Sequence, residues 1–548
     1  MLNINIDGKK MSVANDTTYH ALALSYEKEN AKMPFLVKVD GIIKELRRSV
    51  KQGETIEFLY YDNDVVKESY ARTAIFMMLK AFYDLYGAKN EARLKFKIHN
   101  AYYFELEGKK LTENDVHNVG EAFNKIVEDD FYIEKLTFPK KKAFEIFEEK
   151  KMEDARLLFQ YQYKPLINLR NINGYIRYIN GELLYSTGYI KHYELEFYHE
   201  GLLLILPNGD DVTKVDYSYT AEKLFNVHNV SVDWAKKLRI NTVGKLNDEI
   251  ARNHLNDLVV MTESFQDKQI GDIASCIQKS KKQLILISGP SSSGKTTFSH
   301  RLMYHIKALE LNPHPISCDD FFKERVETPK KPNGEYDFES LRAVDVKLLN
   351  DTLNGLLKGE EVVIPKFDFV LGKKDFTQKK LKINKNDIII LEGIHCLNPK
   401  LTKDVNVNNI FKVYISALTE VCIDYANRIP TSDLRLIRRI VRDKRTRGTD
   451  AKTTLKRWKE IREGEEKYIF PFQEQADIFF NSALIYEFSA LKHKALPMLY
   501  NLSEDEEVGV IAKRLIKTLN YFLNIDTELI PRYSLVREFI GGSSLDVG

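Results

Sequence analysis

Cysteine is scarce in this sequence of 548 residues. The four cysteines are Cys276, Cys318, Cys396 and Cys422. No two of them form a CxxC motif or another spacing typical of metal ligands. This usage excludes the common cysteine-based metal centres and fits a reducing compartment, so we expect a cytoplasmic protein.

Long apolar runs and a strong excess of charge are also missing. No stretch approaches the roughly 20 apolar residues of a membrane-spanning helix, and the opening MLNINIDGKKMSV lacks the features of a secretory signal. The 82 basic residues nearly balance the 79 acidic ones, which gives a net charge of +3. Overall charge therefore predicts no membrane or nucleic-acid partner, and such a role would depend on a local patch.

The sequence does have the composition of an ordinary globular protein, with 43% hydrophobic and 29% charged residues. Because a domain holds roughly 150 residues, this length predicts three or four domains. No internal repeat or low-complexity segment interrupts them. The predicted divisions are a small N-terminal domain at 1–65, a mixed region at 66–215, a helical connector at 216–275, an α/β domain at 276–500 and a helical tail at 501–548.

Residues 1–65 have the alternating pattern of short strands. The turn signal Asp7-Gly8 predicts a hairpin, which is followed by a helix near 19–29 and strands near 35–39 and 55–59. The stretches INIDGKKMSV, VKVDGIIKEL and GETIEFL resemble the TGS domain of threonyl-tRNA synthetases. This resemblance implies a β-grasp fold and carries no chemistry of its own.

The region 66–215 resembles the second additional domain of threonyl-tRNA synthetases, on the order of strand, long helix and strand in YFELEGKKLTENDVHNVGEAFNKIVEDDFYIEKLTF. In that family, a helix presents two histidines four residues apart to a metal, and a Cys and a His follow. Here Tyr70 and Ala74 stand at the histidine positions, and His199 follows alone. We therefore expect neither a metal nor editing chemistry, while tRNA or another RNA remains a possible partner of this half.

A phosphate-binding loop is the strongest motif. Residues 289–296 read GPSSSGKT and match G-x-x-x-x-G-K-[ST], between an apolar strand and a helix, and Thr297 follows the motif directly. In such a loop the backbone N–H groups and the helix N-terminus surround phosphate oxygens, the lysine reaches the terminal phosphates, and the threonine hydroxyl binds Mg²⁺. The predicted ATP-binding residues are Gly289, Ser291, Ser292, Ser293, Gly294, Lys295, Thr296 and Thr297.

Two acidic positions accompany this loop. Asp387 to Glu392 reads as a buried strand that ends in a carboxylate, so Glu392 is a candidate magnesium ligand. The stretch ISCDDFFK supplies two acids after a strand-like entry, and a base near the acceptor is what phosphoryl transfer to a hydroxyl needs.

The motifs SCDDFFK, GEYDFES, IPKFDFV, LEGIH and LIRRIVRDKRTRG occur in this order and resemble uridine kinases and their phosphoribulokinase relatives. The resemblance covers roughly residues 280–485. It implies an α/β kinase with a mainly parallel sheet, in which Asp319 is the catalytic base near the metal and Asp320 is its neighbour in the turn. The implied substrate contacts are Phe322, Glu339, Phe367, Phe369 and Ile394.

Two departures from that family concern the acceptor. Glu339 replaces an aspartate that binds the ribose hydroxyls, and Gly372 replaces a histidine that contacts the pyrimidine base. Because base discrimination depends on buried polar groups that find partners, we expect the loss of the histidine to weaken it. The nucleoside preferred is left open.

Six arginines lie between 435 and 447, and four of them, Arg435, Arg438, Arg439 and Arg442, share one face of a predicted helix. Guanidinium groups suit transferring phosphates because of their charge and forked hydrogen bonds. The resemblance implies that Arg439 and Arg442 contact phosphate or acceptor, with Arg442 also catalytic, and that Arg447 is a lid arginine on ATP. An RNA-binding face and a merely solvated one are the alternatives.

Together these observations predict an ATP- and Mg²⁺-dependent nucleoside kinase that phosphorylates the 5′-hydroxyl. One alternative is a tRNA-binding or regulatory P-loop ATPase. The other is a phosphoribulokinase-like kinase of another small hydroxyl compound. A homo-oligomer is possible, although no interface is identifiable from the sequence.

Overall fold

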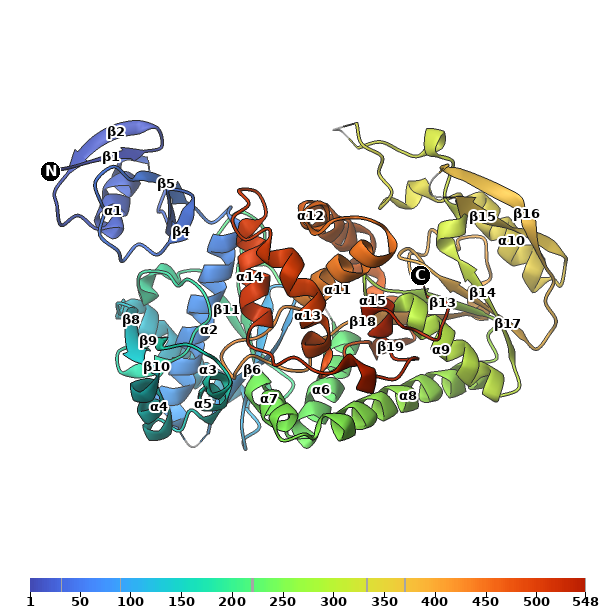
Figure 1. Cartoon of the computed structure of the whole chain (residues 1–548), viewed down its shortest axis with the longest axis horizontal. Helices are drawn as coiled ribbons and strands as arrows, with labels where there is room; N and C mark the ends of the chain where they lie inside the picture. The colour runs from blue at the N-terminus through green and yellow to red at the C-terminus, as the bar shows by residue number, and fades with distance from the viewer. Residues whose placement is uncertain (31, 89, 218–220, 332–333, 369–370, 548) are drawn as a thin grey trace. The chain divides into compact units, whose positions relative to one another are not determined.

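The computed structural model describes the chain apart from residues 31, 89, 218–220, 332–333, 369–370 and 548. Two compact units emerge, and Figure 1 shows the elements of each. Unit 1 comprises Met1–Thr220, Thr242–Lys245 and Cys422–Arg428. Unit 2 comprises Ala221–Asn241, Leu246–Val421 and Ile429–Gly548. Over the described residues, no helix has both the length and the apolar character of a membrane span.

Unit 1 begins with a five-stranded sheet of order β2-β1-β5-β3-β4, packed on helix α1 (Tyr19–Asn30). The strands are β1 (Leu2–Ile6), β2 (Lys9–Val13), β3 (Leu36–Val39), β4 (Ile42–Lys44) and β5 (Thr55–Leu59). The predicted hairpin is confirmed, because β1 and β2 pair antiparallel around Asp7 and Gly8, which both have positive φ. Strands β1 and β5 pair in parallel.

The rest of unit 1 surrounds the long buried helix α2 (Asp64–Tyr86). One antiparallel sheet has the order β11-β12-β7-β6 and another the order β10-β9-β8. Their strands are β6 (Ala92–Ile98), β7 (Ala101–Leu106), β8 (Glu134–Pro139), β9 (Leu166–Ile172), β10 (Tyr175–Arg177), β11 (Glu194–Tyr198) and β12 (Gly201–Ile205). The remaining helices are α3 (Glu113–Glu128), α4 (Lys140–Glu149) and α5 (Glu153–Gln160).

Two of the three positions compared above with metal ligands, Tyr70 and Ala74, lie in the core of unit 1. Tyr70 and Ala74 are both fully buried on α2, and the Tyr70 hydroxyl donates a 2.9 Å hydrogen bond to the carbonyl of His192. His199 is exposed at the β11–β12 turn with φ of 50°. Within the described residues, no group of three or more His, Cys, Asp and Glu side chains is placed to hold a metal ion.

A segment distant in sequence completes unit 1. Cys422–Arg428 follows strand β18 (Ile410–Ser416) in the chain and precedes helix α11 (Thr431–Thr446). The Leu94 amide donates to the carbonyl of Tyr425, and the Tyr425 amide donates to the Asp154 carboxylate at 2.9 Å. This segment of the C-terminal half is therefore part of the fold of the N-terminal unit.

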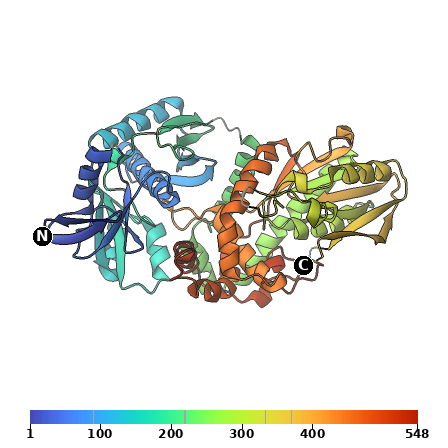
Figure 2. The same cartoon turned by 90° about the horizontal axis from the view of Figure 1, so that it is seen from above.

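Unit 2 is built on a five-stranded parallel sheet of order β14-β17-β13-β18-β19, which confirms the predicted α/β class (Figure 2). Its other strands are β13 (Leu284–Ser288), β14 (Asn312–Ser317), β17 (Asp387–Glu392) and β19 (Ile478–Asn481). The hairpin of β15 (Val362–Asp368) and β16 (Lys373–Leu381) stands apart from this sheet. The central strand β13 is fully buried, as its run of aliphatic residues predicts.

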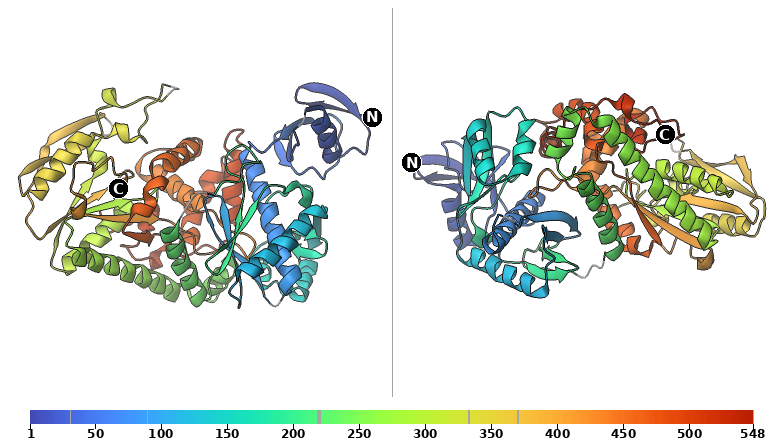
Figure 3. Two further views of the ribbon diagram at one scale, coloured as in Figure 1. Left: turned by 180° about the vertical axis from the view of Figure 1, so that it is seen from behind. Right: turned by 90° about the horizontal axis from the view of Figure 1, so that it is seen from below.

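Helices cover the sheet of unit 2. Helix α9 (Lys295–Ala308) contacts β13, β14 and β17, and α8 (Leu255–Ser280) runs alongside α9 (Figure 3). Leucines of α10 (Val346–Leu357) share a core cluster with strands β13 and β17. The other helices are α6 (Glu222–Lys237), α12 (Ala451–Tyr468), α13 (Glu487–Tyr500), α14 (Gly509–Leu519) and α15 (Arg537–Ile540), and α7 (Val243–Ala251) starts in unit 1 and ends in unit 2. Within the predicted tail at 501–548, helices α14 and α15 are joined by turns and irregular segments.

Candidate active site

The predicted site residues gather at one edge of the parallel sheet. Strand β13 runs into the phosphate loop, β17 ends at Glu392, and β14 ends one residue before Cys318 and two before Asp319. Because these strands are parallel, their carboxyl ends lie together, which is where α/β sheets bind ligands. The topology thus brings together residues that are 97 positions apart in sequence, from Lys295 to Glu392.

The phosphate loop has the tight backbone that its glycines permit. Gly294 has φ of 85°, a conformation that favours glycine, and it directly precedes α9. A Cβ on Gly289 would lie 2.2 Å from the carbonyl oxygen of Ile415, so a side chain at this position would force the backbone apart. Ser292 also has positive φ, at 58°. The loop followed by a helix N-terminus is therefore present as the motif predicts.

Lys295 and Thr296 begin the helix after this loop. The Lys295 ammonium donates to the carbonyls of Gly289 at 3.1 Å and Pro290 at 3.3 Å. The Thr296 hydroxyl donates to the Glu392 carboxylate at 3.4 Å. Both side chains that the motif assigns to phosphate and metal therefore lie beside the acid at the end of β17.

Glu392 is an unusually weak acid in this setting. Desolvation raises its pKa to about 7, and the negative charges of Asp319 and Glu538 add to the rise. Lys295 and the hydrogen bond from Thr296 act in the opposite direction and only partly offset it. Burial is thus the main reason that this carboxyl holds its proton more tightly than an ordinary glutamate.

Asp319 shares this environment and Asp320 does not. Surrounding protein atoms raise the pKa of Asp319 by desolvation although its side chain reaches solvent, while Lys295 lowers the pKa. Asp320 instead accepts a 3.2 Å hydrogen bond from the Phe367 amide and pairs with Lys366 at 3.4 Å. The two adjacent acids therefore differ in position, one facing the loop and one holding strand β15.

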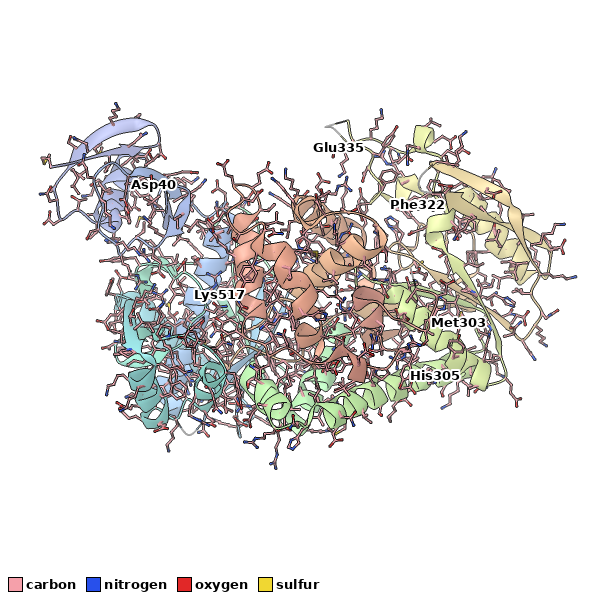
Figure 4. All side chains as sticks on the ribbon, viewed as in Figure 1. Asp40, Met303, His305, Phe322, Glu335 and Lys517 are labelled. Atoms are coloured by element: carbon pink, nitrogen blue, oxygen red, sulfur yellow. The ribbon has the colours of Figure 1, made fainter. Side chains whose placement is uncertain are left out.

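Aromatic side chains collect beside these acids. Phe322, labelled in Figure 4, and Phe367 are buried, and their rings meet edge to face at 5.9 Å. Phe338 packs edge to face on Phe322 at 6.4 Å and keeps 42% of its surface exposed. Phe338 was not singled out in the sequence although it lies in the YDFES motif, and it is the ring of these three that a ligand can reach. Phe369 lies outside the described residues.

Glu339 is the acid expected at the acceptor sugar, and it lies half-buried near Asp319 and Lys295. Desolvation raises its pKa, Arg439 lowers it, and the charges of Glu465 and Asp319 raise it further. These mutual effects place Glu339 in the same electrostatic environment as the phosphate loop. By contrast, the carbonyl of Ile394 accepts from Ser288 at 2.8 Å and its side chain packs on a core cluster around Tyr414.

Two groups of arginines lie on α11 and at its C-terminal end. Arg435 and Arg438 are buried and paired with carboxylates of later helices, through hydrogen bonds of 2.8 Å to Glu465 and 2.7 Å to Glu487. The same guanidinium groups donate to carbonyls of the phosphate loop, at Ser291 and Ser292 respectively. These two arginines therefore stabilise the backbone of the loop, although they share a helical face with Arg439 and Arg442, the predicted phosphate contacts.

Asp443 organises the second group of arginines. Its buried carboxylate lies 3.2 Å from Arg439, 2.7 Å from Arg442 and 3.7 Å from Arg447. Arg439 also donates to the Ser291 hydroxyl at 2.5 Å, and desolvation lowers its pKa to about 10, so it stays charged at neutral pH. Asp443 was not predicted as a functional residue, although its spacing of four residues from both Arg439 and Arg447 could have indicated these pairings.

Gly372 does not leave an empty space. It has φ of 67°, and a Cβ there would lie 2.8 Å from the Cβ of Arg325, whose amide donates to the Gly372 carbonyl at 2.9 Å. Arg325, which the motif analysis did not single out, therefore packs directly on the position where the resembling kinases have histidine.

Comparison with known proteins agrees with the site. Residues 284–486 match the Phosphoribulokinase / Uridine kinase family. A uridine kinase from Mycoplasma genitalium is 30% identical over 178 residues, which is 32% of this chain and 74% of that protein. One from Lactobacillus helveticus is 27% identical over 203 residues, or 36% of this chain and 85% of that protein.

A longer relative and a solved structure are also similar to part of this chain. Uridine kinase-like protein 3 of Arabidopsis thaliana is 29% identical over 196 residues, and this match spans 38% of its length. The structure of a possible uridine kinase from Bacillus stearothermophilus has a TM-score of 0.25 at 18% identity, covering 36% of this chain and 89% of that one. On the family match and the Mycoplasma relative, this chain belongs to the phosphoribulokinase / uridine kinase family.

Proposed function

We propose that this protein is an ATP-dependent nucleoside kinase that transfers the γ-phosphate to a 5′-hydroxyl. The observation that carries the proposal is the meeting of Lys295, Asp319 and Glu392 at the carboxyl edge of the sheet. The phosphate loop would bind ATP, and Asp319 would accept the proton of the attacking hydroxyl. Its raised pKa makes Asp319 a better base than an ordinary aspartate.

The oxygen donors at this edge fit Mg²⁺. The Thr296 hydroxyl and the Glu392 carboxylate are 3.4 Å apart, Asp319 is near, and both acids have raised pKa values that a cation would lower. Mg²⁺ typically takes few protein ligands and completes its shell with water and substrate phosphates, so a set this small suits it. Bound there, the ion would neutralise charge on the ATP phosphates.

The acceptor would lie between Glu339 and the aromatic rings. Glu339 would accept hydrogen bonds from the sugar hydroxyls, and Phe338 offers an exposed face to a base. Arg439 and Arg442, held by Asp443, would face the transferring phosphate, and Arg447 would close over ATP. A planar base with a sugar is the ligand that uses all of these groups, and for this reason we favour a nucleoside over a sugar phosphate.

For unit 1 we propose a TGS-like β-grasp module over residues 1–65, followed by a synthetase-like domain that has no editing metal. The mixed sheet of order β2-β1-β5-β3-β4 with one packed helix supports the first part. Tyr70 and Ala74 support the second, because the Tyr70 hydroxyl is hydrogen-bonded to the His192 carbonyl and the alanine side chain has no ligating atom.

A phosphate-transfer screen tests the proposed function. Purified protein with Mg-ATP is offered uridine, cytidine, the purine nucleosides and ribulose 5-phosphate, and ADP formation is followed for each acceptor. Asp319→Asn is the test variant. Asp320→Asn is the matched control, since it removes the same charge one residue away and touches β15 instead of the loop.

We expect turnover on one or more nucleosides, loss of that turnover by a factor of about 10² to 10⁴ in Asp319→Asn, and a much smaller effect in Asp320→Asn. Turnover on ribulose 5-phosphate alone would identify a sugar-phosphate kinase instead. No transfer to any acceptor, combined with salt-sensitive tRNA binding, would favour the alternative of an RNA-linked ATPase.

A further inference from the structure

The C-terminal segment 531–541 lies against the phosphate loop. The side chain of Leu535 is fully buried and packs on Gly294, where a Cβ would lie 2.2 Å from its Cδ2 atom. Three residues later, Glu538 is 7% exposed and turns its carboxylate toward the start of α9. The tail therefore contacts Gly294 within the motif and Thr297 just after it, although Glu538 and Thr297 are 241 positions apart in sequence.

Glu538 accepts hydrogen bonds from Thr297, a predicted ATP-binding residue that directly follows the motif. The first hydrogen bond within α9 runs from the Phe298 amide to the Gly294 carbonyl, so the Thr297 amide has no partner within the helix. This amide donates to the Glu538 carboxylate at 3.3 Å, and the Thr297 hydroxyl donates to the same oxygen at 2.7 Å. In a phosphate loop, such free amides of the first helical turn cradle the phosphates of a nucleotide.

The charge of Glu538 also opposes a nucleotide. Its carboxylate is near enough to raise the pKa of Glu392, the acid beside the loop. ATP would bring several further negative charges to a site where Asp319 and Glu392 already face each other. A carboxylate and a phosphate compete for the Thr297 donors and repel each other, so the contact of Glu538 with the loop disfavours bound nucleotide.

The tail is held in this place by the arginine-rich helix α11. Arg445 donates to the carbonyls of Glu538 at 2.7 Å and Phe539 at 3.3 Å. The buried guanidinium of Arg438, which also donates to the loop carbonyl of Ser292, lies 4.8 Å from the centre of the Phe539 ring. The helix that carries the arginines proposed to contact phosphate thus also holds the segment that lies against the loop.

We propose that segment 531–541 is an autoinhibitory element in which Glu538 occupies the phosphate donors of Thr297 until the tail withdraws. This inference requires that the loop binds nucleotide, as in the proposed function, but it does not depend on the acceptor. Withdrawal would free the Thr297 amide and hydroxyl and would remove one negative charge from the site. Nucleotide affinity would then depend on how firmly the tail is held.

Nucleotide binding by the full chain, measured by calorimetry without an acceptor, tests this element. The ligands are ADP and inorganic pyrophosphate, since pyrophosphate has the phosphates and lacks the base. Glu538→Gln is the main variant because it keeps the shape and removes the charge. Glu528→Gln is the matched control, being the same charge change at an exposed position of the same tail. Arg445→Gln, which loosens the tail without altering the loop, is the second variant.

We expect Glu538→Gln to bind both ligands about tenfold more tightly than the unaltered chain, a change of ~1.4 kcal/mol. Arg445→Gln should shift affinity in the same direction, and Glu528→Gln should leave it unchanged. Unchanged or weaker binding in both Glu538→Gln and Arg445→Gln, with thermal unfolding as in the unaltered chain, would show that the tail completes the site instead of blocking it.

Failure of this inference is distinguishable from failure of the proposed function. A chain that binds ADP equally in all variants and phosphorylates nucleosides would refute autoinhibition alone. Tighter ADP binding in Glu538→Gln without nucleoside turnover would support autoinhibition and refute the acceptor assignment.

Discussion

Glu465 of α12 accepts a 2.9 Å hydrogen bond from the backbone amide of Ser291 in the phosphate loop. The same buried carboxylate is paired with Arg435 of α11, which donates in turn to the Ser291 carbonyl. Both backbone polar groups of one loop residue are thus satisfied by a single ion pair. The shape of the loop therefore depends on helices that follow it by well over a hundred residues.

Removing a buried arginine behind the loop should destabilise the fold strongly. In Arg438→Ala the carboxylate of Glu487, itself fully buried, loses its partner. Leaving one member of a buried pair uncompensated typically costs about 3–5 kcal/mol. Urea unfolding of unit 2 should show a loss of this size, and Arg457→Ala, at an exposed position of α12, should change stability by less than ~0.5 kcal/mol. Equal effects of the two variants would contradict the supporting role.

Lys295→Ala should abolish most phosphate transfer. The ammonium rests on the carbonyls of Gly289 and Pro290, from which it can turn to the terminal phosphates. Loss of one such charge-stabilising donor costs about 10²–10³ in kcat. Steady-state kinetics with the best acceptor checks this, with Lys307→Ala, exposed near the end of the same helix, as the control. Full activity of Lys295→Ala would remove the loop from the mechanism.

Activity should rise with pH around neutrality. Glu392, whose pKa is raised to about 7, must lose its proton before it can bind a cation, so kcat/KM should increase as pH rises through that value. The groups that set this pKa, besides desolvation, are Lys295, Asp319, Glu538 and the Thr296 hydroxyl. In Glu392→Gln the rate should be low, and this rise should vanish from the pH profile. If kcat/KM of the unaltered chain were constant from pH 6 to pH 8, activity would not depend on the deprotonation of Glu392.

The same group predicts how stability changes with pH. Folding raises the pKa of Glu392, so the protonated side chain favours the folded state. This contribution to folding stability is present below the pKa of an ordinary glutamate and is lost as pH rises from there through about 7. Glu392→Gln cannot ionise and escapes that loss. The melting temperature of the variant relative to the unaltered chain should therefore increase between pH 5 and pH 8. A difference that stays constant over this interval would show that Glu392 has an ordinary pKa.

Arg325 should influence which base is accepted. Its side chain packs on Gly372, at the place where the resembling kinases have histidine. We expect Arg325→Ala to raise KM for the preferred nucleoside several-fold, with kcat changed little and with a smaller difference between bases. Kinetics on a pyrimidine and a purine nucleoside checks this, and Lys323→Ala, two residues earlier, is a control of equal charge. If Arg325→Ala has the same preference between bases as the unaltered chain, Arg325 does not contribute to base specificity.

The sequence predicted the features that short patterns determine. An aliphatic run before GPSSSGKTT indicated β13 and the helix after it, and the apolar run ending in Glu392 indicated the neighbouring strand. Parallel pairing then brings Lys295, Asp319 and Glu392 to one edge without further information. These predictions succeeded because the local pattern and the strand order point to the same place.

Long-range pairings could not be predicted in this way. Helical spacing alone places Arg435, Arg438 and Arg439 on one face, and it does not show that the first two are paired with Glu465 and Glu487 in the core. The contact of Glu538 with Thr297 has no local signal, because a lone glutamate in a turn-rich tail is unremarkable in sequence. Partners brought together by tertiary packing determine which charged residues remain available for ligands.

Phosphorylation of a nucleoside at its 5′-hydroxyl is tested most directly by locating the new phosphate on the product. A preparative reaction of Mg-ATP with the best nucleoside is analysed by phosphorus–proton correlated NMR, with Asp319→Asn run in parallel. We predict a single nucleoside 5′-monophosphate, formed in equal amount to ADP and absent when Asp319→Asn is used. Release of inorganic phosphate alone, or phosphate on another hydroxyl, would contradict it.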